Sequence, residues 1–134
     1  ALALGIKSEE KRAMTSSMSG TSLGDYGQQI YEKYHFTCVY CGFDGRHFDS
    51  WMQLSMDHIR PRKDGGDHSE ENLVVACRAC NSVTSRMRFP RSVTREEILK
   101  QKRQRVAERR KVFYEHWLKH VAPLHLDRPL PEVR

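Results

Sequence analysis

The chain has no long apolar run. No stretch of its 134 residues approaches the ~20 consecutive apolar residues that cross a bilayer. Ala1–Gly5 lacks the basic start and the long apolar core of a secretory signal. Hydrophobic residues make up only 38% of the sequence, which favours a small core stabilised by a bound metal. These absences predict an intracellular protein, neither secreted nor membrane-inserted, with one domain and extensions rather than two full cores.

Cysteine is also scarce, and all of it lies in two C-x-x-C pairs. Cys38 and Cys41 form the first pair, and Cys77 and Cys80 form the second. Each pair can supply two thiolates from one tight turn, and Zn²⁺ prefers four such ligands in a tetrahedron. We therefore predict one structural zinc site, because a zinc ion with four protein ligands has no open position for a substrate. The alternative is two disulfides in a small secreted domain, which the missing secretory signal disfavours.

Acidic residues are outnumbered, and the imbalance is local. The formal net charge is +6 and the sequence pI is near 9.3, values that favour a polyanionic partner. Between residues 86 and 111, eleven Lys or Arg stand against three Glu. The attraction for phosphate is therefore concentrated in one segment.

The N-terminal part of the chain predicts a tail, a helix and a zinc-binding turn. Residues 1–24 have the composition of a tail, with a short helix near Ser8–Arg12 and a small polar linker at Thr15–Ser22. Asp25–Tyr34 carries apolar and aromatic residues at helical spacing and predicts a helix that packs on the zinc site. In Cys38–Gly42 the glycine permits the backbone turn that aims both sulfurs at one ion.

Two short strands and a helix are predicted around the second cysteine pair. Trp51–Ile59 alternates loosely and predicts a strand that ends at Pro61, because proline cannot continue a central ladder. Leu73–Ala76 predicts a second strand, and Arg62–Glu71 is the loop that joins the two. A helix is expected from residue 79 or 81 to residue 87.

The C-terminal segment predicts one long helix. Thr94-Arg95-Glu96-Glu97 has the pattern of a capping box, and the helix is expected to continue to about Val121. Its apolar stripe is narrow in the first half and broadens around Phe113 and Trp117. We expect the first half to face solvent or DNA and the second half to pack on the domain. A solvated charged helix without a ligand is the alternative.

Several short motifs follow one another from the first cysteine pair to the second. They are Cys38-x-x-Cys41, Asp57-His58-Ile59-Arg60-Pro61, Gly65-Gly66, Asn72-Leu73 and Cys77-x-x-Cys80-Asn81. In this order they resemble the HNH endonuclease family, in the subclass whose ββα-metal fold is buttressed by a four-cysteine zinc. The resemblance covers Tyr34 to about Arg88 and leaves the long basic helix outside.

The resemblance implies an α+β fold. It consists of a small ββα-metal nuclease core with a structural zinc, flanked by an N-terminal helix and a long basic C-terminal helix. The predicted organisation is a flexible N-terminal tail (1–24), the nuclease domain (25–90), a basic amphipathic helix (91–122) and a C-terminal tail (123–134).

The pair Asp57 and His58 carries the predicted chemistry. Hydrolysis of a phosphodiester needs an activated water and neutralisation of charge in the transition state. His58 suits the role of general base, because an imidazole with a pKa of about 6.5 is largely neutral at pH 7. Asp57 offers a hard oxygen ligand to Mg²⁺ or Mn²⁺. Neighbours on a strand point to opposite faces, and the resemblance implies a local geometry that lets both residues serve.

Two asparagines complete the implied site. Asn81 occupies the position of the last motif residue, a ligand of the catalytic ion, and its neutral amide favours hydrated Mg²⁺. Asn72 resembles the middle motif residue, and its amide is expected to hold the strand of His58 by bonding backbone groups across the loop. The alternative for both is a capping role. The other histidines show no ligand spacing and are interpreted as surface or packing residues: His35, His47, His68, His116, His120 and His125.

DNA contacts are predicted from basic residues around the centre and along the helix. Family members often carry Lys four residues after the last motif residue. Here that position is Ser85, and Arg86 or Arg88 is expected to replace the lysine. The full predicted set is Arg60, Arg62, Lys63, Arg86, Arg88, Lys102, Arg103, Arg109 and Arg110.

The sequence thus predicts a Mg²⁺- or Mn²⁺-dependent endonuclease that hydrolyses DNA to 5′-phosphate and 3′-hydroxyl ends. The alternative is a zinc-stabilised DNA-binding module without nuclease activity. His58 beside Asp57 favours the enzyme, because a binding module needs no general base. Cutting both strands would need a homodimer, for which the Phe113–Trp117 end of the long helix is a candidate interface.

Overall fold

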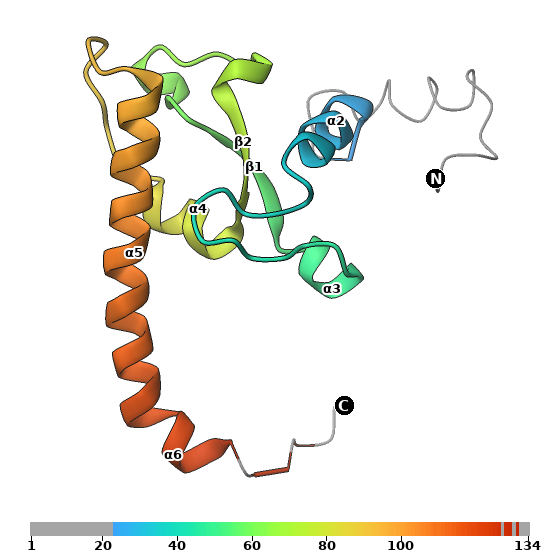
Figure 1. Ribbon diagram of the computed structural model, residues 1–134, viewed down its shortest axis with the longest axis vertical. Coiled ribbons are helices and arrows are strands. Elements are labelled where there is room, and N and C mark those ends of the chain that lie inside the picture. Colours follow the sequence, from blue (N-terminus) through green and yellow to red (C-terminus); the bar gives the residue numbers. More distant parts are fainter. Residues whose placement is uncertain (1–22, 127, 130, 132–134) are drawn as a thin grey trace, which may run out of the picture.

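The fold is built around two short strands and the helix that follows them (Figure 1). The computed structural model describes residues 23–126, 128, 129 and 131, so the expected tail helix and linker lie outside the described residues. The elements are, in chain order, α2 (Asp25–Lys33), α3 (Phe48–Trp51), β1 (Leu54–His58), the 3-10 turns η1 (Arg62–Asp64) and η2 (Glu70–Asn72), β2 (Leu73–Cys77), α4 (Arg78–Thr84), α5 (Arg95–His120) and α6 (Ala122–His125).

The two strands and α4 form a ββα unit. β1 and β2 are antiparallel, with Leu54 opposite Cys77 and His58 opposite Leu73. α4 begins directly after β2, because the Cys77 side chain caps it by accepting a hydrogen bond from the N–H of Cys80. One residue, Cys77, therefore ends the strand, caps the helix and offers a thiol.

The first strand is shorter than expected. The predicted strand begins at Trp51, but Phe48–Trp51 forms the helical turn α3 and β1 starts at Leu54. The Trp51 N–H and the Ser50 hydroxyl both donate to the carbonyl of His47, and these local bonds stabilise a turn rather than a strand.

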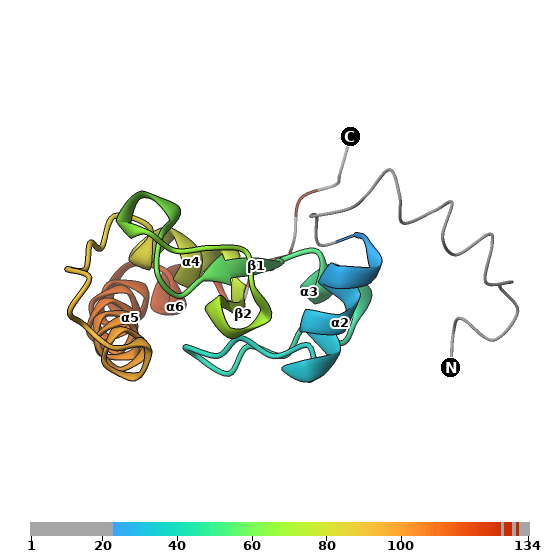
Figure 2. The ribbon, with the colours of Figure 1, turned by 90° about the horizontal axis from the view of Figure 1, so that it is seen from above.

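The second strand is buried on both faces. Leu73 and Val75 pack with the apolar residues of α2, whereas Val74 and Ala76 join the cluster that contains the cysteines and the start of α5. This alternation follows from the two-residue period of a strand. The sheet therefore lies between α2 on one side and α4 and α5 on the other, as Figure 2 shows from above.

The first half of α5, not the second, packs on the domain. Its buried residues are Ile98, Leu99, Lys102 and Val106. The large apolar residues after residue 111 are exposed, and in Figure 1 this end of the helix extends past the ββα unit. The expected orientation was wrong because the width of an apolar stripe does not show which part of a helix meets a neighbour. The buried face also includes Lys102, whose charge is paired inside the protein.

The predicted α+β class is confirmed. A two-stranded sheet is combined with helices, α2 precedes it and the long α5 follows it. The Thr94 side chain caps α5 by accepting from the N–H of Glu97, as the capping-box pattern predicts. Among the residues that the structure describes, no helix has both the length and the apolar character needed to cross a bilayer.

Candidate active site and zinc centre

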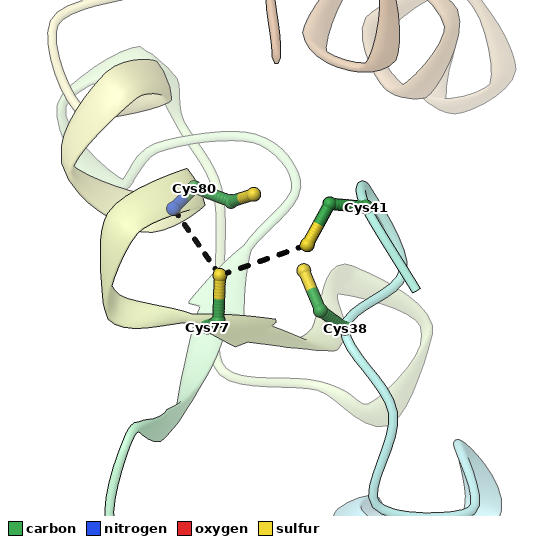
Figure 3. A group of neighbouring side chains, drawn as sticks. All are labelled: Cys38, Cys41, Cys77 and Cys80. Atoms are coloured by element: carbon green, nitrogen blue, oxygen red, sulfur yellow. Dashed lines mark hydrogen bonds between the residues drawn. The ribbon is translucent and has the colours of Figure 1, made fainter. Parts of the chain in front are cut away.

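The four thiols converge on one point (Figure 3). The ligand atoms of Cys38, Cys41, Cys77 and Cys80 all lie within 4.8 Å of one another, and none of these cysteines is in a disulfide. The sulfurs of Cys41 and Cys77 are 3.8 Å apart. Tetrahedral zinc with Zn–S bonds of about 2.3 Å separates its ligands by about 3.8 Å. The donor set therefore fits zinc, and the disulfide alternative is wrong.

Local backbone geometry brings the first pair to the second. Gly42 has φ +79°, in the left-handed region that residues with side chains rarely adopt. Its N–H bonds the carbonyl of Cys38 at 2.9 Å and closes the turn. The N–H of Val39 donates to the carbonyl of Val75 at 2.9 Å, which ties this turn to β2 beside the second pair.

Four thiols this close cannot all ionise without a cation. A hydrogen bond from Cys77 lowers the pKa of Cys38 to about 4, and the same bond raises the pKa of Cys77. Burial, together with the charge of Cys38, raises the pKa of Cys80 to about 12. A divalent ion removes this competition because it stabilises every thiolate.

A cavity of about 540 Å³ lies between the end of β1, the loop that follows it and α4. Asp57 and His58 of β1 and Asn81 of α4 line this cavity. The structure thus brings together three of the residues predicted to be catalytic, and Asn72 does not line the cavity. The remaining lining residues are Met56, Pro61, Arg62, Lys63, Thr84, Ser85, Arg86, Arg88 and Lys102.

Asp57 is held through one of its two oxygens. Oδ2 accepts a hydrogen bond from the Tyr40 hydroxyl at 2.5 Å and one from the Lys102 ammonium at 3.3 Å. Burial and the Asp57 charge raise the pKa of Tyr40, so its hydroxyl remains a donor. Within the described residues no hydrogen bond engages Oδ1, which leaves this oxygen for a ligand in the cavity.

His58 points to the opposite face of β1 from Asp57. Its Nε2 lies 3.1 Å from Nδ1 of His68, whereas Asp57 faces α5. Both side chains still line the cavity, because β1 ends at His58. Burial, with the positive charge of Arg62, lowers the pKa of His58 from its ordinary value of 6.5. The imidazole is therefore neutral at pH 7 and able to take a proton.

His68 belongs to the site, although the sequence favours a surface or packing role for it. Its ring lies against the ring of His58, with centroids 5.3 Å apart, and against that of Tyr26 of α2 at 5.4 Å. Its carbonyl accepts from the Tyr26 hydroxyl at 2.7 Å. The spacing of residues in the sequence does not indicate a role for His68, because its contact with His58 arises only when the loop after β1 folds back toward the strand.

The two asparagines make different contacts. Asn81 donates through Nδ2 to the Ser55 hydroxyl at 3.1 Å, which leaves its Oδ1 without a protein partner in the described chain. Asn72 accepts from the N–H of Arg60 at 2.9 Å and donates to the carbonyls of Arg60 at 3.0 Å and Asp67 at 2.7 Å. These bonds hold both ends of the loop that follows β1.

The oxygens left open in the cavity fit a hard divalent cation. Asp57 contributes a carboxylate oxygen and Asn81 an amide oxygen, the ligand types that Mg²⁺ and Mn²⁺ take in proteins. A single carboxylate leaves most of the coordination to water and to substrate oxygens, as is usual for Mg²⁺.

Arg60 and Arg88, both predicted to contact DNA, are bonded to neighbouring segments of the protein. Arg60 donates to the carbonyls of Pro90, at 3.1 Å, and Val93. Arg88 is paired with the carboxylate of Asp64. Both arginines therefore hold neighbouring segments together.

The other basic residues differ in exposure. Lys102 is only 2% exposed, so the expectation that it contacts DNA is wrong, because a side chain this buried cannot reach a duplex. Exposed cations at the cavity are Arg62, Lys63 and Arg86. On α5, Arg103 donates to the carbonyl of Val39 at 3.3 Å, the Arg109 guanidinium lies over the Phe113 ring, and Arg110 is exposed.

Comparison with known proteins identifies the central segment. Residues 38–86 match the family model described as HNH endonuclease. No curated protein and no solved structure matches the chain. The segment from Cys38 to Arg86 thus matches the HNH endonuclease domain, and its four neighbouring thiols fit the zinc-binding subclass.

Proposed function

We propose that this protein is a metal-dependent endonuclease that hydrolyses phosphodiester bonds of DNA. The observation that supports the proposal is the cavity of the HNH domain, which joins Asp57, His58 and Asn81. One histidine is neutral, two oxygens are open to an ion, and exposed cations lie at the same cavity. Hydrolysis of a phosphodiester requires these parts together.

His58 is the proposed general base. Its neutral ring takes one proton from a water molecule as the water oxygen attacks phosphorus. The P–O3′ bond breaks, which leaves a 5′-phosphate and, after protonation of the leaving oxygen, a 3′-hydroxyl. The lowered pKa of His58 supports this role because it keeps the ring unprotonated at neutral pH.

Asp57 and Asn81 are the proposed holders of a hydrated Mg²⁺ or Mn²⁺. When bound, this ion supplies positive charge to the transition state and to the leaving oxygen. Tyr40 and Lys102 fix the Asp57 carboxylate through Oδ2, so its other oxygen needs little reorganisation before it binds the ion.

The zinc site supports the reaction without taking part in it. Four thiolates leave a zinc ion no open position. When bound, the ion would join the turn after Cys38 to the end of β2 and the start of α4, and so would hold the helix that carries Asn81 against β2, the strand that pairs with β1.

The DNA backbone is proposed to contact Arg62, Lys63 and Arg86. These cations are exposed at the cavity, and Arg86 stands beside the position at which family members often carry lysine. The surface extends onto α5 with the exposed Arg103 and Arg110 and the half-buried Arg109. Contacts of this kind supply affinity and register but little sequence information.

We propose that the activity is intracellular, because DNA is found inside the cell. We also propose that a homodimer is the form that cuts both strands. One chain offers one centre and is sufficient for a nick. The exposed Phe113 and Trp117 of α5 supply an apolar surface for pairing two chains. Sedimentation of the full chain at increasing concentration measures this association.

A plasmid assay tests the nuclease proposal. Supercoiled plasmid is incubated with the full chain and Mg²⁺, Mn²⁺ or EDTA. We expect relaxed or linear DNA with either ion and intact plasmid with EDTA. His58→Ala should keep its zinc and its affinity for the plasmid but lose cleavage. His47→Ala changes an exposed histidine that does not line the cavity and should cut like the wild type. A wild-type chain that binds DNA but cuts none would be a zinc-stabilised DNA-binding module.

A further inference from the structure

Two histidine rings meet at the end of β1. Nε2 of His58 lies 3.1 Å from Nδ1 of His68, and both rings are partly buried. A hydrogen bond between two neutral imidazoles requires one nitrogen to carry the hydrogen and the other to carry a lone pair. Two tautomers satisfy the contact, and they differ in which nitrogen of His58 is left to accept a proton.

Arg62 distinguishes the two arrangements. Its Nη2 lies 3.3 Å from the same Nδ1 of His68. A guanidinium has donors only, so this contact requires a lone pair on Nδ1 of His68. The hydrogen between the rings must then belong to Nε2 of His58.

His68 is itself fixed in this orientation. Its carbonyl accepts from the Tyr26 hydroxyl at 2.7 Å, and its ring packs on the Tyr26 ring. Immediately before it, the carbonyl of Asp67 accepts from Asn72 at 2.7 Å. Nε2 of His68 is buried and has no hydrogen-bond partner among the described residues. An unpaired buried polar atom is unfavourable, so its retention calls for a reason other than packing.

We propose that His68 is a positioning residue that, with Arg62, holds His58 in the tautomer with hydrogen on Nε2 and a bare Nδ1. Nδ1 of His58 is then the nitrogen that takes the proton from the attacking water. This inference rests on the proposed role of His58 as general base. It adds the nitrogen that acts and the residues that select it.

Nitrogen-detected NMR of the full zinc-loaded chain tests the tautomer directly, because the two ring nitrogens have different shifts when one is protonated. We expect wild-type His58 at neutral pH to carry its hydrogen on Nε2. A hydrogen on Nδ1 of His58 would overturn the inference even if the protein cuts DNA. A wild-type chain that shows the expected tautomer but cuts no DNA would overturn the proposed function instead.

Two substitutions of His68 test its positioning role. His68→Asn keeps an acceptor close to the position of Nδ1, whereas His68→Leu removes it. We expect His68→Leu to mix the His58 tautomers and to lower kcat at unchanged KM by roughly 10- to 100-fold, the range seen when a metal-bound histidine loses its outer hydrogen-bond partner. His68→Asn should restore most of kcat and the single tautomer.

Zinc content and thermal unfolding show whether each variant is folded, and His47→Leu, at an exposed histidine outside the cavity, should change neither readout. A folded His68→Leu variant with wild-type kcat and an unchanged tautomer would show that His68 only packs. The wild-type spectrum decides the tautomer even if that variant does not fold.

Discussion

The ammonium of Lys102 lies 3.3 Å from Oδ2 of Asp57, and both residues are buried. The same ammonium donates to the carbonyl of His58 at 2.9 Å. Lys102 belongs to α5, outside the segment 38–86 that matches the HNH family. An element beyond the family segment therefore holds both adjacent residues of the candidate centre.

Replacing Lys102 tests this coupling. Lys102→Met keeps the apolar stem but leaves the Asp57 carboxylate buried without its cation. Breaking a buried ion pair by removing one partner costs about 3–5 kcal/mol, and cleavage should fall because Asp57 loses its orientation. Urea unfolding measures the first effect and a plasmid assay the second. Lys100→Met, at an exposed position of the same helix, should change the free energy of unfolding by less than about 0.5 kcal/mol. Equal unfolding midpoints for the two variants would show that the Lys102–Asp57 pair contributes no net stability.

Zinc should remain bound under conditions that remove the catalytic ion. Thiolate ligation in a buried site resists mild chelation, whereas a hydrated ion on two oxygen ligands exchanges quickly. After dialysis against EDTA we expect about one zinc per chain by elemental analysis, and Mg²⁺ alone should restore cleavage. Folded, active protein without zinc would contradict the four-thiolate site.

A single thiol substitution should unfold the domain. Cys77→Ser removes a ligand and the cap of α4, and we expect a loss above about 4 kcal/mol, the size seen when a metal site is lost. Ser92→Ala, at an exposed position, is the matched control and should unfold with the wild type. Thermal unfolding, monitored by circular dichroism, measures the stability of the two variants. A Cys77→Ser variant as stable as the control would show that the core does not depend on the ion.

The features set by local spacing could be predicted from the sequence, and those set by tertiary contacts could not. The cysteine pairs, the β2 strand and the Thr94 cap depend on short-range patterns, and the structure contains all of them. The burial of Lys102 could not be predicted, because a lysine on a charged helix has the same local pattern whether or not a buried carboxylate faces it. His68 has no distinguishing neighbours in sequence, and its role depends on how a loop folds back onto β1.

Removing the amide of Asn81 should lower the affinity of the site for the catalytic ion without destabilising the fold. Asn81→Ala should raise the Mg²⁺ concentration for half-maximal cleavage by roughly tenfold, equal to about 1.4 kcal/mol of ion binding, and high Mg²⁺ should partly restore the rate. Ser82→Ala, on the exposed side of α4, should keep the wild-type requirement. Asp57→Ala should act in the same direction but also destabilise the fold, because it leaves the buried Lys102 ammonium without its negatively charged partner. A Mg²⁺ requirement unchanged in Asn81→Ala would remove this residue from the set of ligands.

The loop after β1 should depend on the Asn72 amide. Asn72→Ala removes the bonds to both backbone groups of Arg60 and to the carbonyl of Asp67. Each hydrogen bond contributes a net of about 1 kcal/mol, so the loss of all of them should lower the free energy of unfolding by about 2–4 kcal/mol. The activity defect should grow with temperature. Asn72→Asp keeps the acceptor for the Arg60 N–H and should be intermediate. Activity measured from low to high temperature checks this order, and an Asn72→Ala defect independent of temperature would indicate a direct part in the chemistry.

The salt dependence of DNA binding should distinguish the basic residues at the cavity from those on α5. Each phosphate contact adds about −0.9 to the slope of log K against log salt for duplex DNA. Replacing Arg62, Lys63 and Arg86 with Gln should flatten this slope and also slow cleavage, because these residues are exposed at the cavity itself. The α5 variant replaces Arg103, Arg109 and Arg110 with Gln. It should flatten the slope but leave cleavage at saturating DNA intact.

Arg46→Gln is the matched control, since Arg46 is exposed, pairs with Asp44 and does not line the cavity. Filter binding at several salt concentrations measures the slope for each variant. If the contacts are to the DNA backbone, each variant should lose the same affinity for every duplex sequence. An unchanged slope in the α5 variant would show that this side of the helix is a solvated face. The phosphate contacts would then be confined to the cavity, where the exposed cations and His58 converge on the same bond.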